Sequence, residues 1–268
     1  MRKVKILRSN LNYLITITVV LIVFIGGMSC SGTREILKLA DTAQAAEEVG
    51  IENPTVEANN QFGLQLFQRL YQTNKNLFIS PLSISIALTM TLNGATGDTQ
   101  QEMKKALALS DLDLETINSD FGNLQKSLQL NSSPIKLQIA NSLWGREDLV
   151  FDSDFLQINR DYFNAKLQSV NFKNQQSIID INQWVKDRTS GKIDQVISQV
   201  EPETILFLIN AVYFKGNWTK AFNPKKTTKR KFFLIDGSQR TVDMMSQSGR
   251  YLTYKNSDFQ AIRLPYDN

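Results

Sequence analysis

The sequence contains no histidine and a single cysteine, and these two absences exclude several kinds of chemistry. Without histidine the chain cannot build a Ser-His-Asp or Cys-His nucleophile pair, a histidine zinc site or an imidazole switch near neutral pH. One cysteine cannot close an intrachain disulfide or form the paired cysteines of a structural zinc site. Stability must therefore come from a buried core, and 268 residues with 42% apolar content are enough to build one.

Sequence signatures of catalysis are missing as well. No Gly-x-Ser-x-Gly, His-Glu-x-x-His or dinucleotide-binding glycine pattern occurs. The closest group of acids, Glu147, Asp148, Asp152 and Asp154, fits a surface turn and a helix start, where carboxylates cap the helix and are solvated. The sequence therefore predicts a protein that is not an enzyme and that binds no cofactor and no metal.

The excess of positive charge lies at the start of the chain. The formal net charge is +4, and Arg2, Lys3, Lys5 and Arg8 supply it, so that basic and acidic residues balance in the rest of the sequence. A body that is neutral by count has no global electrostatic attraction to nucleic acid or to an anionic membrane surface. We therefore predict no nucleic-acid partner.

The first thirty residues have the pattern of an export signal. A basic start is followed by an apolar run from Leu14 to Met28 and by small residues near Cys30, which is typical of a secretory signal peptide. The run is shorter than the roughly 20 apolar residues that a bilayer span needs, although an uncleaved anchor stays open as an alternative.

Gly27-Met28-Ser29-Cys30 also resembles a bacterial lipoprotein signal, in which Cys30 would carry the lipid; plain secretion, with Cys30 incidental, is the alternative. We predict a signal peptide over residues 1–30 and a linker over 31–55. The protein would then be exported, whether extracellular, periplasmic or lipid-anchored at the cell envelope. It would touch a membrane only through an N-terminal lipid or an uncleaved signal.

Apolar periodicity divides the body from residue 56 onward into helices and strands. Helices are predicted from Val56 to Leu70, from Pro81 to Leu92, from Thr99 to Leu107, over 152–162 and over 178–189. Ser80 suits the N-cap position of the second of these helices, and Pro81 its first position. Strands are predicted over 137–143, 167–172, 205–214, 230–235, 240–245, 251–256 and 259–264. The last four would be short antiparallel strands, because turn residues separate them.

The strand over 205–214 is apolar on both faces, which is typical of a central strand covered from both sides. Asn210 is the single polar residue inside it. A buried amide that lacks hydrogen-bond partners costs about 1–3 kcal/mol, so Asn210 must find partners in the core.

Four blocks of sequence resemble the serpins. They are Asn-Leu-Phe-Ile-Ser-Pro-Leu-Ser-Ile at 76–84, Asn-Gly-Ala-Thr-Gly-Asp-Thr at 93–99, Ala-Asn-Ser-Leu-Trp at 140–144 and Ile-Asn-Ala-Val-Tyr-Phe-Lys-Gly-Asn-Trp at 209–218. The blocks occur in the order of that family, and the resemblance extends from residue 56 to residue 268. It implies an α+β fold in which helices pack on a large central β-sheet beside smaller antiparallel sheets.

The resemblance also implies an inhibitor of serine or cysteine proteases that acts as a monomer. In serpins, the standard example of strand insertion, the protease cuts a reactive loop, and the loop then enters the main sheet as an extra strand. The resemblance assigns Ser80, Ser83 and Asn210 to the shutter, a polar network where the sheet must open, and Trp218 to the breach, where the loop enters. The alternative for Asn210 is a satisfied core amide without a switching role.

The serpin reactive loop follows further helices and strands, and nothing in these 268 residues resembles its alanine-rich hinge. We therefore expect residues 56–268 to be the N-terminal two-thirds of a serpin domain, incomplete at the C-terminus. Two hypotheses follow. One is a protease inhibitor whose loop is missing from this chain, so that the chain itself is inactive. The other is a secreted or lipid-anchored serpin-like binding protein that does not inhibit.

A basic cluster precedes and enters the strand at 230–235. It consists of Lys225, Lys226, Lys229, Arg230 and Lys231. The cluster could bind a polyanion, or it could be the solvated face of an edge strand that lysines protect from pairing with other chains. We favour the edge strand.

Overall fold

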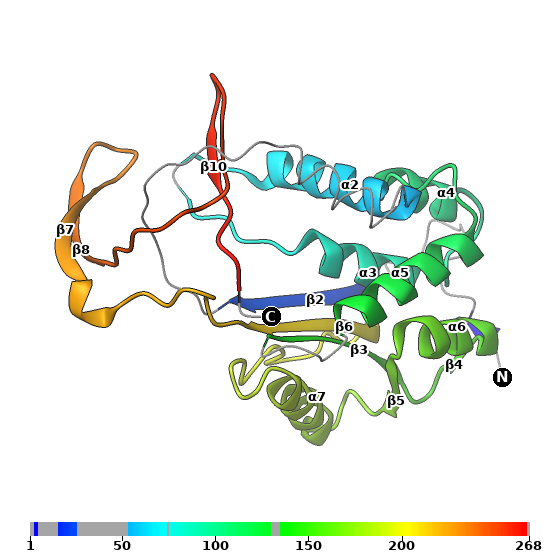
Figure 1. The fold of residues 1–268 in the computed structure, drawn as a ribbon. Helices are drawn as coiled ribbons and strands as arrows, with labels where there is room; N and C mark the ends of the chain where they lie inside the picture. Colours follow the sequence, from blue (N-terminus) through cyan, green and yellow to red (C-terminus); the bar gives the residue numbers. More distant parts are fainter. Residues whose placement is uncertain (1–2, 5–15, 26–52, 74, 130–134, 267–268) are drawn as a thin grey trace.

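The computed structural model describes residues 3–4, 16–25, 53–73, 75–129 and 135–266 (Figure 1). The helices there are α2 (Pro54–Leu70), α3 (Pro81–Leu92), α4 (Gly97–Ala106), α5 (Leu114–Leu128), α6 (Ser153–Phe163), α7 (Gln175–Arg188) and a short 3₁₀ turn, Pro224–Lys226. The strands are β1 (Lys3–Val4), β2 (Thr16–Ile25), β3 (Lys136–Arg146), β4 (Val150–Phe151), β5 (Lys166–Val170), β6 (Thr204–Lys215), β7 (Thr228–Phe233), β8 (Gln239–Met244), β9 (Thr253–Lys255) and β10 (Gln260–Ile262).

Every helix and strand that the sequence pattern predicts from residue 56 onward is present, with its ends shifted by a few residues. The pattern analysis missed α5. This helix begins where the Asp113 carboxylate accepts hydrogen bonds from the backbone N–H and the hydroxyl of Thr116, both at 2.8 Å. Those two bonds hold the pKa of Asp113 below its usual value, because they stabilise the charged form.

The central sheet has the strand order β2-β6-β3-β5. β6 and β3 are antiparallel, whereas β5 runs parallel to β3 and β2 runs parallel to β6. β2 lies within the predicted signal peptide, and its backbone pairs with β6 from Thr16 to Ile25. Cys30 lies outside the described residues, as do residues 31–52 of the predicted linker, so the signal peptide, linker and lipid site stay predictions.

Helices cover both faces of the sheet, with α2, α3, α5 and α6 on one side and α7 on the other (Figure 1). Alternate residues of β6 divide between the two cores. Leu206, Leu208 and Val212 pack with the larger group of helices, and Phe207 and Ile209 pack against α7. The prediction of a central strand buried on both faces is therefore confirmed.

Two hairpins extend from the left end of the sheet in the view of Figure 1. One is β7–β8 and the other is β9–β10, and both are antiparallel. All residues of β7 are exposed, and Lys229 lies 3.4 Å from Asp243 of β8 in an exposed ion pair. The basic cluster thus lies on the solvated 3₁₀ turn and the first strand of this hairpin. An exposed ion pair of this kind contributes little stability.

Close packing of α5 on α6 depends on Gly122. A Cβ atom added there would lie 2.8 Å from the backbone carbonyl oxygen of Tyr162. We expect Gly122→Ala to lower the free energy of unfolding by about 1–3 kcal/mol, because a backbone atom cannot move aside as a side chain can. Alanine is the better helix former by about 1 kcal/mol, so a gain in stability on urea unfolding would contradict this packing. Asn123→Ala, at the next and exposed position, is the control.

Candidate functional site

Asn210 lies in the middle of β6, with none of its surface exposed to solvent. Its position is directly opposite Asn141 of β3, which is also buried. The Asn210 Nδ2 donates a hydrogen bond to Asn141 Oδ1 at 2.7 Å. The amide is therefore partnered, and its bond fastens β6 to β3.

Asn141 also forms hydrogen bonds with two helices. Its Nδ2 donates to Gln125 Oε1 of α5 at 2.9 Å and to the carbonyl oxygen of Phe163, the last residue of α6, at 2.8 Å. Gln125 Nε2 donates to the same carbonyl oxygen at 3.4 Å. We call Asn210, Asn141, Gln125 and the Phe163 carbonyl the amide chain. It crosses β6, β3, α5 and the end of α6 within a core that is otherwise mostly apolar.

Sequence analysis did not assign Asn141 or Gln125 to the site, although the pattern holds a signal for each. Asn141 lies two residues from both Ile139 and Leu143, on the face of the strand that packs on the helices. Gln125 follows Ile117 and Phe121 at intervals of four, which places it on the buried stripe of α5. A polar side chain on an apolar face needs partners in the interior.

Ser80 and Ser83 lie together at the start of α3, where the Ser80 hydroxyl donates to Ser83 Oγ at 2.9 Å. Ser80 occupies the expected N-cap position, but its side chain bonds to Ser83 instead of to a backbone N–H. α3 packs against β6. Among the described residues no hydrogen bond joins the serine pair to Asn210, and the Asn210 Oδ1 has no partner there.

Trp218 lies beyond the end of β6, away from the shutter candidates. Its ring stacks on Tyr266 with the centroids 4.4 Å apart and the planes 12° apart, and the same two residues form an isolated β-bridge. The Tyr266 ring also contacts Phe214 edge to face at 5.0 Å. The resemblance assigned Trp218 to the breach, and this assignment stays a prediction.

Other kinds of site are not found in the described part of the chain. Within residues 53–73, 75–129 and 135–266, no three histidine, cysteine, aspartate or glutamate residues lie together so that they could hold a metal ion. None of the described helices has the length and apolar content of a membrane span.

Comparison with known proteins gives one consistent result. The sequence model of the family described as "Serpin (serine protease inhibitor)" matches residues 57–268. An uncharacterized serpin-like protein of Thermococcus kodakarensis is 33% identical over 94% of this chain and 63% of its own length. The leukocyte elastase inhibitor of Equus caballus is 36% identical over 78% of this chain and 57% of its own.

A solved structure shares the fold. Human thyroxine-binding globulin complexed with thyroxine superposes with a TM-score of 0.72 and 30% identity over 79% of this chain and 59% of that one. The chain therefore spans less than two-thirds of the length of each of these proteins. The family match, the similar relatives and the α+β architecture agree, and the chain belongs to the serpin family.

Proposed function

We propose that this chain is the body of a serpin-type inhibitor of serine or cysteine proteases, and that it is exported, monomeric and not an enzyme. The observation that carries the proposal is the edge of β6 that faces away from β3. In the structure this edge pairs with β2, a strand of 10 residues from a distant part of the chain. An edge that pairs over this length has the backbone donors and acceptors to take up a cleaved loop.

The amide chain supports a division of the sheet into two parts: β3 and β6, which stay together, and the other edge of β6, along which the loop is added. Asn210 bonds across to β3, so the incoming strand would not have to break that bond. The Asn210 Oδ1 is left without a partner among the described residues, which costs about 1–3 kcal/mol for a buried acceptor. We propose that a donor from a strand or side chain arriving at this shutter satisfies the acceptor. Trp218, at the end of β6, would mark the breach where the strand enters.

The protease experiment compares two proteins. One is the 268-residue chain, and the other is the same chain extended at its C-terminus by the part of the Thermococcus kodakarensis relative that lies outside the matched 63% of that protein. Each is mixed with chymotrypsin, elastase and papain and run on a denaturing gel. We expect no detergent-stable complex from the 268-residue chain, because it lacks a recognisable reactive loop, and an equimolar covalent complex from the extended chain.

Two outcomes would contradict the proposal. A detergent-stable complex with the 268-residue chain would show that the reactive segment lies within it. An extended chain that folds, as judged by a cooperative thermal transition, but leaves all three proteases active would favour the second candidate function. That candidate is a serpin-like binding protein without inhibitory activity, and the similarity to thyroxine-binding globulin supports it.

Export through a lipoprotein signal makes a separate prediction. We propose that Cys30 carries the lipid, and we expect Cys30→Ser to move the protein from the membrane fraction of an expressing bacterium to the soluble fraction. The two acyl chains of a diacylated cysteine hold a protein on a bilayer. A protein whose export signal is cleaved without lipidation keeps no such anchor. Immunoblots of the two fractions measure the shift. Retention of the variant in the membrane would support an uncleaved anchor, and a soluble parent protein would exclude the lipid.

A further inference from the structure

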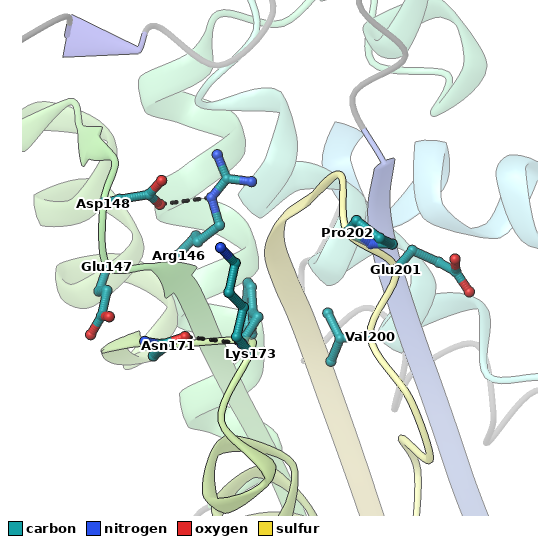
Figure 2. A pocket seen from close by; sticks show the side chains of 9 residues that line it. Arg146, Glu147, Asp148, Asn171, Lys173, Val200, Glu201 and Pro202 are labelled. Carbon is teal, nitrogen blue, oxygen red and sulfur yellow. Dashed lines mark hydrogen bonds and ion pairs between the residues drawn. The ribbon is translucent and has the colours of Figure 1, made fainter.

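A pocket opens where three segments meet at one end of the central sheet. Residues 146–148 include the end of β3 and the two residues after it, residues 171–173 follow β5, and residues 200–202 precede β6 (Figure 2). Its volume is about 580 Å³, which lies within the range of roughly 300–1,000 Å³ typical of small-molecule sites. The shutter candidates do not line it, so it is separate from the site described above.

One side of the pocket is cationic. Arg146 is fixed by its Nε, which lies 2.7 Å from Asp148 Oδ1, while its side chain keeps 30% of its surface exposed. The terminal guanidinium nitrogens and the Lys173 ammonium have no hydrogen-bond or ion-pair partner among the described residues. In Figure 2 the two cationic groups point toward the same space.

The carboxylates around the pocket do not cancel this charge. Glu147 and Glu201 point away from the two cations, on opposite sides of the view in Figure 2. Asp148 is held on Arg146 Nε. Two positive charges therefore meet a single negative charge in the space between Arg146 and Lys173, and an anion placed there would relieve the repulsion between them.

The remaining lining is apolar. Phe172 lies against Phe207 of the core, edge to face at 5.2 Å, so its ring is held in position. Val200 is half-buried in the same core cluster, and Pro202 lies beside it on the segment that leads into β6. A ligand for this pocket thus needs an anionic group on one side and an apolar body on the other.

We infer that this pocket binds a small organic carboxylate, with the acid between Arg146 and Lys173 and the apolar part on Phe172, Val200 and Pro202. A guanidinium whose terminal nitrogens are free offers two parallel donors, which match the two oxygens of a carboxylate. A bound ligand would bridge the segment before β6 to the ends of β3 and β5. The inference does not depend on protease inhibition.

The test uses the 268-residue chain with 3-phenylpropionate as the probe and 3-phenylpropanol as its uncharged counterpart, followed by titration calorimetry at low ionic strength. We expect the acid to bind at least tenfold more tightly than the alcohol and to raise the melting temperature. The double variant Arg146→Gln, Lys173→Gln should weaken binding of the acid at least tenfold. Lys126→Gln, which removes one exposed lysine from α5, is the control for the loss of a positive charge away from the pocket and should change nothing.

A second variant tests the apolar wall. Val200→Asp places a negative charge inside the pocket and should abolish binding of the acid while the circular dichroism spectrum stays that of the parent. Equal binding of acid and alcohol would overturn the inference, as would binding of the acid that survives the double variant. Loss of binding with Lys126→Gln would show that the attraction is a general charge effect and would overturn it too.

Discussion

Replacing Asn141 by alanine should lower the free energy of unfolding by about 3 kcal/mol or more, because the change removes the centre of the amide chain. The Asn210 amide and Gln125 Oε1 would be orphaned, and the Phe163 carbonyl would keep only the longer bond from Gln125 Nε2. Each orphaned buried donor or acceptor costs about 1–3 kcal/mol, and repacking or water entry recovers part of the sum. Urea unfolding followed by far-ultraviolet circular dichroism measures the change.

Two comparisons isolate the amide chain in this experiment. Gln138→Ala truncates an exposed amide three residues away on the same strand and should change stability by less than about 0.5 kcal/mol. The double variant Asn141→Ala, Asn210→Ala should cost clearly less than the two single changes added together, since both break the same bond. Strict additivity would mean that the bond between the two asparagines contributes nothing to stability.

Trp184→Ala should also destabilise the protein strongly, by about 3–5 kcal/mol, because the indole is the largest side chain that α7 places against the sheet. Trp184 is 7% exposed, and its ring meets that of Trp144 of β3 edge to face, with the centroids 6.4 Å apart. Ile181 and Val185 flank it on the buried side of the helix. Without the ring, α7 keeps only aliphatic contacts with the sheet, and we expect it to exchange its amide hydrogens faster than the rest of the core.

Trp184→Phe is the matched control for this change. The indole N–H is buried and has no hydrogen-bond partner among the described residues, so phenylalanine removes an unsatisfied donor while it keeps most of the ring. The phenylalanine variant should therefore cost much less than the alanine variant in the same unfolding experiment. Equal losses would show that the N–H group has a partner, such as a bound water, that contributes as much as the ring.

These two experiments probe opposite faces of one strand pair. The amide chain joins β3 and β6 to α5 and α6 on one side, and the tryptophan pair joins β3 to α7 on the other. Under the proposed mechanism, β3 and β6 would stay together while a strand is added along the other edge of β6. Extended chains that carry Asn141→Ala should then lose this rigidity and polymerise faster on heating.

The order of helices and strands could be predicted from the sequence, because it depends on the local spacing of apolar residues. Alternation around Ile139 and Leu143 predicted β3, and the long apolar run predicted the doubly buried β6. The sequence pattern did not predict α5, because the apolar stripe of this helix is sparse and carries Gln125 at a position where a hydrophobic residue is usual. Ser80 was expected to cap α3 through its side chain, but its hydroxyl donates to Ser83 instead. The Ser83 hydroxyl is a nearby acceptor that competes with the backbone for the Ser80 side chain.

By itself the sequence determined the family, the α+β class, the exclusion of histidine chemistry, and the burial of Asn210, because each of these depends on residue identity or on spacing along the chain. Only the tertiary structure decided what Asn210 bonds to and which charges share a pocket. Strand register sets Asn141 opposite Asn210, and the meeting of three strand ends brings Arg146 and Lys173 to one space. Contacts between segments this far apart depend on how the strands are paired, and neither composition nor periodicity records that pairing.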